Sequence, residues 1–229
     1  MYRIIVLTIM ATKAKNPESE VITIPRMDIR TLSLRIVGDT PLIMHRVDEK
    51  FKKQFLDDML GTAKTKKRDT KDPFREFLNS MYWLDSEKKQ QLPDEVTEEN
   101  LEDVIKSGKY SFGFPSTAFK NSAAAGAYRS NITKDKVSVY GAIYIIGEFV
   151  TIKGIPRMRE DIVKLPNGMP DIRYRGCFDK WETNLTIRFN TAVFSAEQVA
   201  NLFNLGGFAV GVGEWRPEKK GQFGMFHVE

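Results

Sequence analysis

Hydrophobic and polar residues alternate in two segments, residues 30–37 and residues 181–189. A period of two places every second side chain on one side, which is typical of a β-strand with one buried face. The inward positions are Leu32, Leu34 and Ile36 in the first segment and Leu185, Ile187 and Phe189 in the second. The sequence therefore predicts two half-buried strands, and a shorter strand is expected at 225–228.

A helix is expected over residues 117–129. Pro115 and Ser116 precede it, and both residue types are favoured where a helix begins. Residues 123–127 are all alanine or glycine. Such small side chains would let this helix lie close to a sheet.

A second helix is expected to begin after Ser195. Ser195 and Gln198 have the spacing of a capping box, in which each side chain bonds the backbone N–H of the other residue. Gly206 and Gly207 predict the end of this helix, because glycine accepts the left-handed conformation common after a last turn.

Residues 137–146 and 148–153 are rich in β-branched and aromatic side chains and are joined at Gly147. This pattern predicts a β-hairpin between the first helix and the strand at 181–189. The elements then follow the βαββαβ order of a ferredoxin-like, or RRM-like, domain. The expected fold class is therefore α+β.

Residues 40–106 interrupt this order with hydrophobic residues at helical spacing. We expect a largely helical, thumb-like insertion after the first strand, with a mobile basic hinge near 62–71. The core would comprise 29–39 and 107–229, and 1–28 would form an N-terminal strand or extension. The spaced hydrophobic residues are Phe51, Phe55, Met59, Phe74, Phe77, Leu78 and Met81.

The composition fits a folded, water-soluble chain. Of 229 residues, 41% are hydrophobic and 28% are charged. No apolar run approaches the roughly 20 residues that a membrane-spanning helix needs. The only cysteine, Cys177, excludes an internal disulfide and fits a reducing compartment, so we expect cytoplasmic localisation. Residues 1–10 are apolar but lack a signal-peptide cleavage site, which indicates a strand or a true start at Met10 instead of Met1.

Charge is unevenly distributed along the chain, although the net charge is only +5. Residues 50–75 are basic and residues 85–103 are acidic, and such blocks usually lie on solvated helices or loops. A mild positive excess points weakly to polyanionic partners. The insertion residues expected to follow the phosphates of a bound nucleic acid are Arg46, Lys64, Lys66, Lys67 and Arg68.

Residue counts and spacing exclude most catalytic and metal-binding designs. The chain has two histidines and one cysteine, with no C-x-x-C or H-E-x-x-H motif, so we expect no metal and no other cofactor. A Walker-type phosphate loop and a G-x-S-x-G nucleophile motif are both absent. Gly211 and Gly213 are followed by Glu-Trp-Arg and not by the start of a helix, which argues against a dinucleotide-binding loop.

His45 and Asp39 are the candidates for proton transfer, as in metal-free cleavage of RNA. Both follow the first expected strand. The alternative, which we favour for lone titratable residues, is that Asp39 shapes a turn and His45 packs or caps. His227, between Phe226 and Val228, is expected to be structural.

Residues 206–224 contain six glycines, which allow a backbone to approach a ligand closely and to offer free N–H groups to phosphate. An aromatic side chain beside cations suits single-stranded nucleic acid, since bases stack and phosphates need positive charge. The alternative is a solvated hairpin tip with an exposed tryptophan. The residues expected to contact nucleic acid in this segment are Trp215, Arg216, Lys219 and Lys220.

Two further groups of polar residues are candidates for the same role. Ser116 and Lys120 begin the helix at 117–129, where the helix dipole favours an anion, and Arg129 ends it. They could instead form its solvated face. The other group lies between expected strands, in a segment interrupted by proline and glycine that we expect to be a mobile basic loop in contact with nucleic acid or a neighbouring subunit. Its cations are Arg157, Arg159, Lys164, Arg173 and Arg175.

Two of these segments together resemble a known family. Residues 112–120, Phe-Gly-Phe-Pro-Ser-Thr-Ala-Phe-Lys, lead to Arg129 and are similar to the Pro-Gly-Ser-Ser-Leu-Lys-Gly helix-start motif of the RAMP superfamily of CRISPR effector proteins. Residues 206–224 resemble the glycine-rich loop of that family. The order of elements and the insertion after the first strand are also similar to its backbone-forming members.

The resemblance implies a protein that binds RNA or single-stranded DNA along a filament of identical subunits, without a cofactor. It also admits a stand-alone relative, for instance one encoded by a phage or another mobile element. In that family an acidic residue after the first strand sometimes cleaves RNA, and Asp39 is a loose positional match.

We therefore expect a non-catalytic protein that binds single-stranded RNA or DNA and assembles along it as a homo-oligomer. One alternative is a metal-independent ribonuclease that uses His45 or Asp39. The other is a virion or interaction protein without nucleic-acid binding, in which the acidic residues 85–103 would contact a protein partner.

Overall fold

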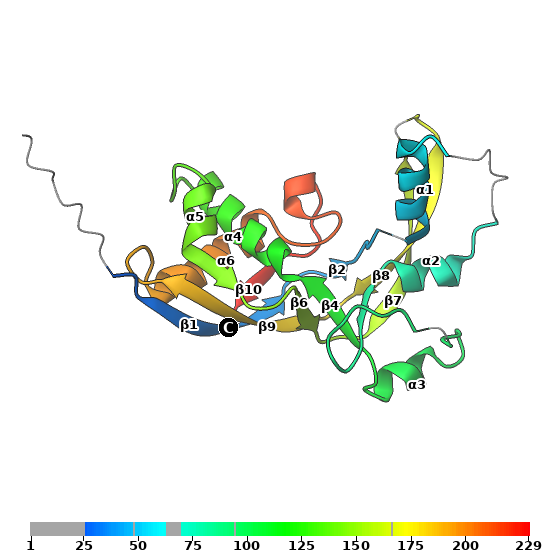
Figure 1. The fold of residues 1–229 in the computed structure, drawn as a ribbon, viewed down its shortest axis with the longest axis horizontal. Helices are drawn as coiled ribbons and strands as arrows, with labels where there is room; N and C mark the ends of the chain where they lie inside the picture. Colours follow the sequence, from blue (N-terminus) through cyan, green and yellow to red (C-terminus); the bar gives the residue numbers. More distant parts are fainter. Residues whose placement is uncertain (1–25, 48, 63–69, 94, 166) are drawn as a thin grey trace, which may run out of the picture.

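The computed structural model describes residues 26–229, except residues 48, 63–69, 94 and 166. It is an α+β structure of three antiparallel sheets and the helices packed on them (Figure 1). The expected N-terminal strand and both candidate start positions lie in residues 1–25, outside the described part. The candidates Lys64, Lys66, Lys67 and Arg68 lie outside it as well.

The largest sheet has four strands in the order β10-β1-β9-β5, and neighbouring strands are antiparallel. Leu34 of β1 is opposite Leu185 of β9, and both are buried. The alternation predicted for 30–37 and 181–189 is confirmed, as is a short strand near the end of the chain. The strands are β1 (Ile29–Gly38), β5 (Ile143–Ile145), β9 (Glu182–Asn190) and β10 (Phe226–Val228).

Two helices, α4 (Ser116–Arg129) and α6 (Ala196–Ala209), lie on the buried side of this sheet (Figure 1). Phe119 of α4 and Phe203 of α6 are fully buried in the core that they share with the strands. Both helices occur where the sequence predicts them. The capping box of Ser195 and Gln198 at the start of α6 is also confirmed.

The predicted end of α6 is wrong, because the helix continues past Gly206 and Gly207 to Ala209. These glycines do not end the helix but allow it to pack closely against its neighbours. A β-carbon on Gly206 would lie 2.6 Å from the carbonyl carbon of Ser122 in α4. A β-carbon on Gly207 would clash with the carbonyl oxygen of Phe226 in β10.

The predicted hairpin at 137–153 is also wrong. Its first part is the short helix α5 (Val137–Ala142), where the Asp135 carboxylate accepts a 2.7 Å hydrogen bond from the Ser138 backbone N–H. The strands on either side of Gly147 then join different sheets. Strand β5 pairs with β9, whereas β6 (Phe149–Ile152) pairs with β4 (Ser111–Pro115).

The expected mobile basic loop is a regular β-ribbon. Strands β7 (Pro156–Lys164) and β8 (Pro170–Phe178) pair over their full length, and β2 (Leu42–Ile43) adds to β8. The prolines stand at the starts of the strands, where they do not interrupt the pairing. The arginines of the ribbon are held by carboxylates, as in Arg157 with Asp179 and Arg173 with Asp171.

The described residues of the insertion at 40–106 form three helices and also two strands. Strand β3 (Tyr82–Leu84) pairs with β4, which completes the third sheet in the order β3-β4-β6. Trp83 and Met81 are buried in the same core as the four-stranded sheet. The helices are α1 (Glu49–Met59), α2 (Pro73–Asn79) and α3 (Leu101–Lys106).

Cys177 lies in β8 with no exposed surface. Burial raises the pKa of its thiol. No helix in the described part of the chain is long and apolar enough to cross a bilayer.

Candidate nucleic-acid interface

The glycine-rich segment after α6 is a hydrogen-bonded loop and not a loose hairpin tip. The backbone N–H of Glu214 donates to Ile43 over 3.0 Å, and that of Gly224 donates to Pro41 over 2.8 Å. Gly213 has a φ of +79°, and a β-carbon there would lie 2.5 Å from the Ile43 carbonyl oxygen. Glycine is therefore required where the loop crosses β2. The loop also contains a single 3-10 turn, η1 (Pro217–Lys219).

Glu218 in η1 fixes two of the predicted contact residues. Its carboxylate accepts a 2.8 Å hydrogen bond from Arg216 and a 3.3 Å hydrogen bond from Arg129 at the end of α4. Although burial opposes ionisation, these guanidinium groups keep the pKa of Glu218 below its usual value. Arg216 and Arg129 therefore join the loop to α4.

Three predicted residues of this loop remain exposed. Trp215 keeps 40% of its surface in solvent, and its φ of +53° turns the backbone sharply at this point. Lys219 and Lys220 are exposed, and within the described chain neither ammonium group meets a carboxylate. An aromatic face and two cations thus stand together on a fixed loop.

A cavity of about 420 Å³ lies between this loop and α4. We name it the α4 cavity. The small-residue face of α4 and residues 210–214 of the loop line it from two sides. Its lining also includes Lys136 and Tyr140 of the α5 region and Tyr82 of β3.

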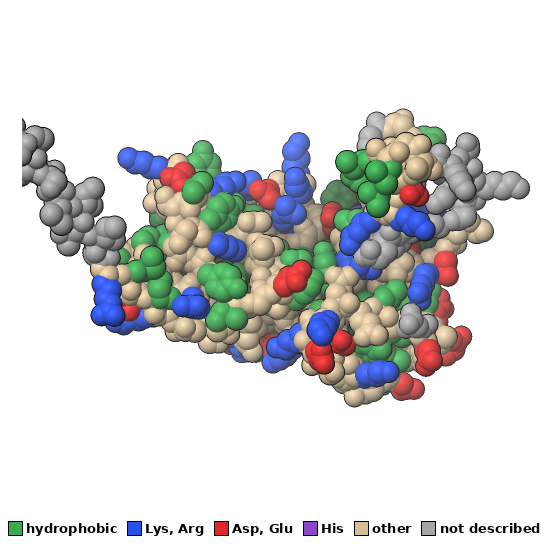
Figure 2. Space-filling view, in the orientation of Figure 1, with side chains coloured by type: hydrophobic (Ala, Val, Ile, Leu, Met, Phe, Trp, Pro, Cys, Tyr) green, Lys and Arg blue, Asp and Glu red, His purple; other side chains and the backbone are tan. Residues whose placement is uncertain are grey.

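A second cavity of about 670 Å³ lies between α2 and β8, and we name it the α2 cavity. His45 lines both cavities, so they adjoin there. Figure 2 shows the surface hollowed between the part that carries η1 and the lobe that carries α1. The charged residues of the α2 cavity are Arg46, Lys71, Arg75, Arg173, Arg175, Asp72, Glu76 and Asp171.

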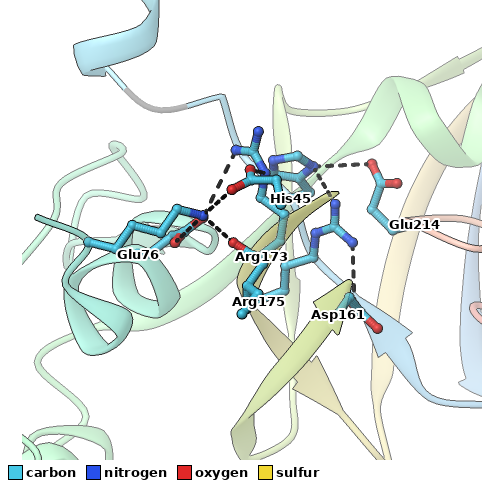
Figure 3. Close-up of polar contacts among 9 residues, drawn as sticks. His45, Glu76, Asp161, Arg173, Arg175 and Glu214 are labelled. Carbon is cyan, nitrogen blue, oxygen red and sulfur yellow. Dashed lines mark hydrogen bonds and ion pairs between the residues drawn. The ribbon is translucent and has the colours of Figure 1, made fainter. Parts of the chain in front are cut away.

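His45 belongs to a chain of charged groups at this junction (Figure 3). Its Nδ1 lies 3.6 Å from Oε1 of Glu214 and 3.5 Å from Nη2 of Arg175. Arg175 is buried and also binds Asp161, with 3.3 Å between Nη1 and Oδ2. The neighbouring His45 ring and the charge of Arg175 lower the pKa of the Glu214 carboxyl, against the effect of burial.

Asp39 lies in a different environment from His45. Its carboxylate is 2.6 Å from Nδ1 of His227 in β10, and this pair is half exposed. Asp39 lines neither cavity. The two residues considered for proton transfer therefore do not share a site, and His227 has a polar partner that its flanking sequence did not indicate.

The N-terminal end of α4 is covered by the chain itself. The Ser116 hydroxyl donates to the Gly147 carbonyl over 2.6 Å, and the Ser116 backbone N–H donates to Glu148 over 2.8 Å. The turn at 147–148 thus takes the place that we expected an anion to occupy. Lys120, one turn later, places its ammonium group 6.0 Å from the centre of the Tyr140 ring.

The other predicted cations are held by neighbours. Arg159 lies 2.9 Å from Asp161 and stacks 4.7 Å from the centre of the Phe223 ring, which ties the ribbon to the glycine-rich segment. Arg46 is 8% exposed and donates to the Asn79 carbonyl over 3.2 Å. Among these remaining cations, Lys164 at the end of β7 is exposed and has no carboxylate partner in the described residues.

The open face of the four-stranded sheet carries few aromatic side chains. The outward positions of the two central strands carry small polar residues, charged residues and one valine, and Tyr144 of the edge strand β5 is exposed. Base stacking on the central strands is therefore not supported. Those outward residues are Thr31, Ser33, Arg35, Val37, Glu182, Asn184, Thr186 and Arg188.

Sequence reasoning missed the carboxylates that organise the site. Glu214 and Glu218 flank Trp215 and Arg216, and this alternation of charges within a glycine-rich segment was the available signal. Tyr140 was assigned to a hairpin strand, and Lys136 was in no predicted element, so neither was considered as a lining residue. Among the described residues there is no group of three or more His, Cys, Asp or Glu side chains suited to a metal ion.

Comparison with known proteins adds no relative. The chain matches no protein-family model and no curated protein.

Proposed function

We propose that this protein binds single-stranded nucleic acid without cleaving it, along the groove formed by the α4 and α2 cavities. The observation that carries this proposal is the exposure of Trp215 beside Lys219 and Lys220 on a hydrogen-bonded loop at the edge of the groove. A base can stack on the indole while the ammonium groups meet phosphates. Bases of a duplex are paired and stacked, so the same contacts favour a single strand.

The charge of the groove supports the same function. The α2 cavity contains four arginines and one lysine against three carboxylates, and His45 adds a titratable group. Phosphates entering this cavity would replace internal carboxylates as partners of Lys71 and Arg173, which are half exposed. Binding should therefore weaken steeply with salt, because each phosphate contact releases counterions.

A ferredoxin-like core of the RAMP type is part of this proposal. The order β10-β1-β9-β5, with α4 after β1 and α6 after β9, supports it, because it places the first and third strands of the βαββαβ unit at the centre. We also propose self-assembly along the strand. Exposed hydrophobic side chains occur on α1, as Leu56 and Met59, and at the start of α5, as Val137, and these two helices lie on opposite sides of the molecule (Figure 1).

Fluorescence anisotropy with labelled single-stranded RNA, single-stranded DNA and duplex, at two salt concentrations, tests the proposal. Light scattering on the same samples reports particle mass. Salt-sensitive binding to single strands with growth in mass is the expected result. Absence of binding by a folded protein would reject the proposal and favour an interaction protein that uses the acidic residues 85–103.

A ribonuclease is the second candidate, because His45 lies beside Glu214 and the buried Arg175 at the junction of the cavities. A histidine with a carboxylate partner can transfer protons, and a guanidinium group can stabilise a phosphorane. This candidate predicts RNA cleavage in EDTA that is lost in His45→Ala and retained in Asp39→Ala.

A further inference from the structure

Strand β7 forms an open edge of its sheet. The sheet order is β2-β8-β7, so among the described residues no strand pairs with the outer side of β7. The strand is nine residues long and pairs with β8 over its whole length on the other side. A long and regular edge strand presents a row of unpaired backbone groups, to which another strand can add.

The direction of the backbone groups of β7 follows from Gly176 of β8, which lies opposite Met158. The Gly176 carbonyl accepts a 2.9 Å hydrogen bond from Met44, which directly follows β2, and its N–H donates to the Ser80 hydroxyl over 2.8 Å. Both groups of Gly176 are therefore directed away from β7. Opposite residues of an antiparallel pair exchange both hydrogen bonds or neither, so Met158 directs its N–H and its carbonyl outward.

The alternation along a strand extends this assignment to Glu160 and Ile162. Pro156, which has no N–H to donate to β8, falls in the same alternate positions, as the assignment requires. Among the described residues, no hydrogen bond uses the backbone N–H or carbonyl of Met158, Glu160 or Ile162. Three successive outward positions of β7 are thus free to pair with an added strand.

The side chains beside this edge are mainly apolar. Met158 is 43% exposed and Ile162 is 72% exposed, and both lie on one face of the ribbon. Ile172 of β8 lies opposite Ile162 and is 39% exposed. Glu160 contributes a single negative charge between Met158 and Ile162. Such a surface fits an apolar peptide strand better than the phosphates of a nucleic acid, because strand addition combines main-chain hydrogen bonds with contacts of alternate side chains.

A segment of suitable sequence lies outside the described residues. Residues 2–9, Tyr-Arg-Ile-Ile-Val-Leu-Thr-Ile, are aromatic, aliphatic or threonine except for Arg3, and these residue types are favoured in strands. We name residues 2–9 the N-terminal segment. Its single charge is opposite in sign to that of Glu160, and pairs of opposite charge stabilise neighbouring strands.

The position of β1 indicates which copy of the chain would accept this segment. Strand β1 begins at the end of the molecule opposite to the β7–β8 ribbon (Figure 1). To reach the ribbon of its own chain, the segment would need residues 10–25 to pass along the whole molecule. A second copy placed head to tail brings the two ends together without this requirement.

We infer that the N-terminal segment of one copy adds as a strand to the open edge of β7 in the next copy. The contact joins different surfaces of the two copies, so it can repeat and produce a row of subunits. The inference rests on the self-assembly in the proposed function and names its contact, but the contact itself needs no nucleic acid.

Sedimentation velocity of the full chain without nucleic acid tests this contact, and the wild-type mass should rise with concentration. Glu160→Pro removes one outward N–H and leaves the hydrogen bonds to β8 intact, as for prolines on edge strands. Glu160→Ala is the matched control, because it removes the same side chain and keeps the N–H. The proline variant should need about tenfold more protein to assemble than the alanine variant does. Ile162→Pro, at the next outward N–H, should behave like Glu160→Pro.

A mixing experiment shows whether the segment pairs with another copy and whether the variants are folded. The double variant Ile4→Pro/Ile5→Pro disables the segment, whichever of these two N–H groups faces β7. At a concentration where the wild type assembles, this variant and Glu160→Pro should each stay monomeric. Their equimolar mixture should form particles of two chains, because one variant keeps its segment and the other keeps its edge. Misfolded variants could not form this particle, and the melting temperature of each variant should lie near that of the wild type.

The outcomes are distinguishable from those of the proposed function. A wild type that stays monomeric, or proline variants that assemble as readily as Glu160→Ala, overturns strand addition. A mixture of folded variants that stays monomeric overturns the contact between copies and assigns the segment to its own chain. Fluorescence anisotropy of the same samples reports single-strand binding separately. A wild type that assembles through this edge without binding any strand would reject nucleic-acid binding and leave the contact intact.

Discussion

Gly126 of α4 and Gly206 of α6 meet backbone to backbone. A β-carbon on Gly126 would lie 2.5 Å from the backbone nitrogen of Gly206. Because the glycine-rich loop begins directly after α6, this contact also sets how near the loop lies to α4. The spacing of the two helices and the width of the α4 cavity therefore depend on the same pair of glycines.

Gly126→Ala should lower the free energy of unfolding by about 1–3 kcal/mol, because helix backbones cannot separate without disturbing the core. Urea denaturation followed by circular dichroism measures this. Gly141→Ala is the matched control, since Gly141 lies in α5 with nothing within 4 Å of the added carbon. We expect that control to be neutral or up to about 1 kcal/mol more stable. Equal losses in both variants would contradict the role of the contact.

Glu218→Gln should loosen the glycine-rich loop, because one carboxylate holds both Arg129 and Arg216. We expect a loss of about 1 kcal/mol in the free energy of unfolding. Relative to the wild type, amide hydrogen exchange in residues 214–221 should become faster, and by more than in the rest of the chain. Glu87→Gln, which removes an exposed pair with Lys89, should change neither quantity. An unchanged exchange rate in Glu218→Gln would refute this account of the loop.

Stability at acid pH should depend on Glu182. Hydrogen bonds from Lys153 and Arg35 lower the pKa of its carboxyl from 4.5 to about 2. Because the pKa is lower in the folded state, the stabilisation is fully present above pH 4.5 and is lost as the pH falls towards 2. The difference in melting temperature between wild type and Glu182→Gln should therefore shrink over this interval. A difference that stays constant with pH would contradict the ion pairs, and added salt should reduce it because they are exposed.

Trp215→Ala should weaken binding of single strands by about 1–3 kcal/mol for each base that loses its stacking partner. Its free energy of unfolding is measured in parallel, because Trp215 is 40% exposed and loss of the buried part of the indole lowers stability by itself. Tyr144→Ala serves as control, because Tyr144 is an exposed aromatic residue on the open sheet face. If Tyr144→Ala weakens binding and Trp215→Ala does not, the strand lies across the sheet and the proposed groove is incorrect.

Lys219→Ala should change the salt dependence of binding more than its specificity. Loss of one phosphate contact lowers the slope of log K against log salt by about 0.7 for a single strand. Lys180→Ala removes another exposed cation, one that lines neither cavity, and its slope should match the wild type. Identical slopes in the two variants would remove Lys219 from the interface.

The sequence correctly predicted those elements whose type is indicated by the pattern of their own residues. The alternation in β1 and β9 and the capping box of Ser195 are of this kind, and all were confirmed. The ribbon of β7 and β8 was missed because its charged residues pair with one another across and along the strands, as Arg175 does with Asp161, and so hide the alternation. Helix α5 was missed because its β-branched residues favour a strand, and the hydrogen bond by which Asp135 caps the helix was not considered.

The candidate site was less predictable than the fold, because its decisive contacts join distant residues. The turn at Gly147 covers the start of α4 from 31 positions away, and no pattern around Ser116 indicates this. Glu214 meets His45 only after the loop has crossed β2. The exposure of Trp215, Lys219 and Lys220, by contrast, is indicated by the glycine-rich, charged segment in which they lie. All three were among the predicted contacts.

Because Cys177 is buried, the reaction of its thiol with chemical probes can be used to follow unfolding of the native chain. Because its only thiol is enclosed in β8, a maleimide reagent should react slowly with the folded protein and rapidly once the core opens. The rate of labelling then reports unfolding without any engineered reporter. A cysteine introduced at the exposed position of Lys219 could carry a fluorophore beside the groove while the native thiol stays unmodified, so that strand binding and unfolding can be followed on one molecule.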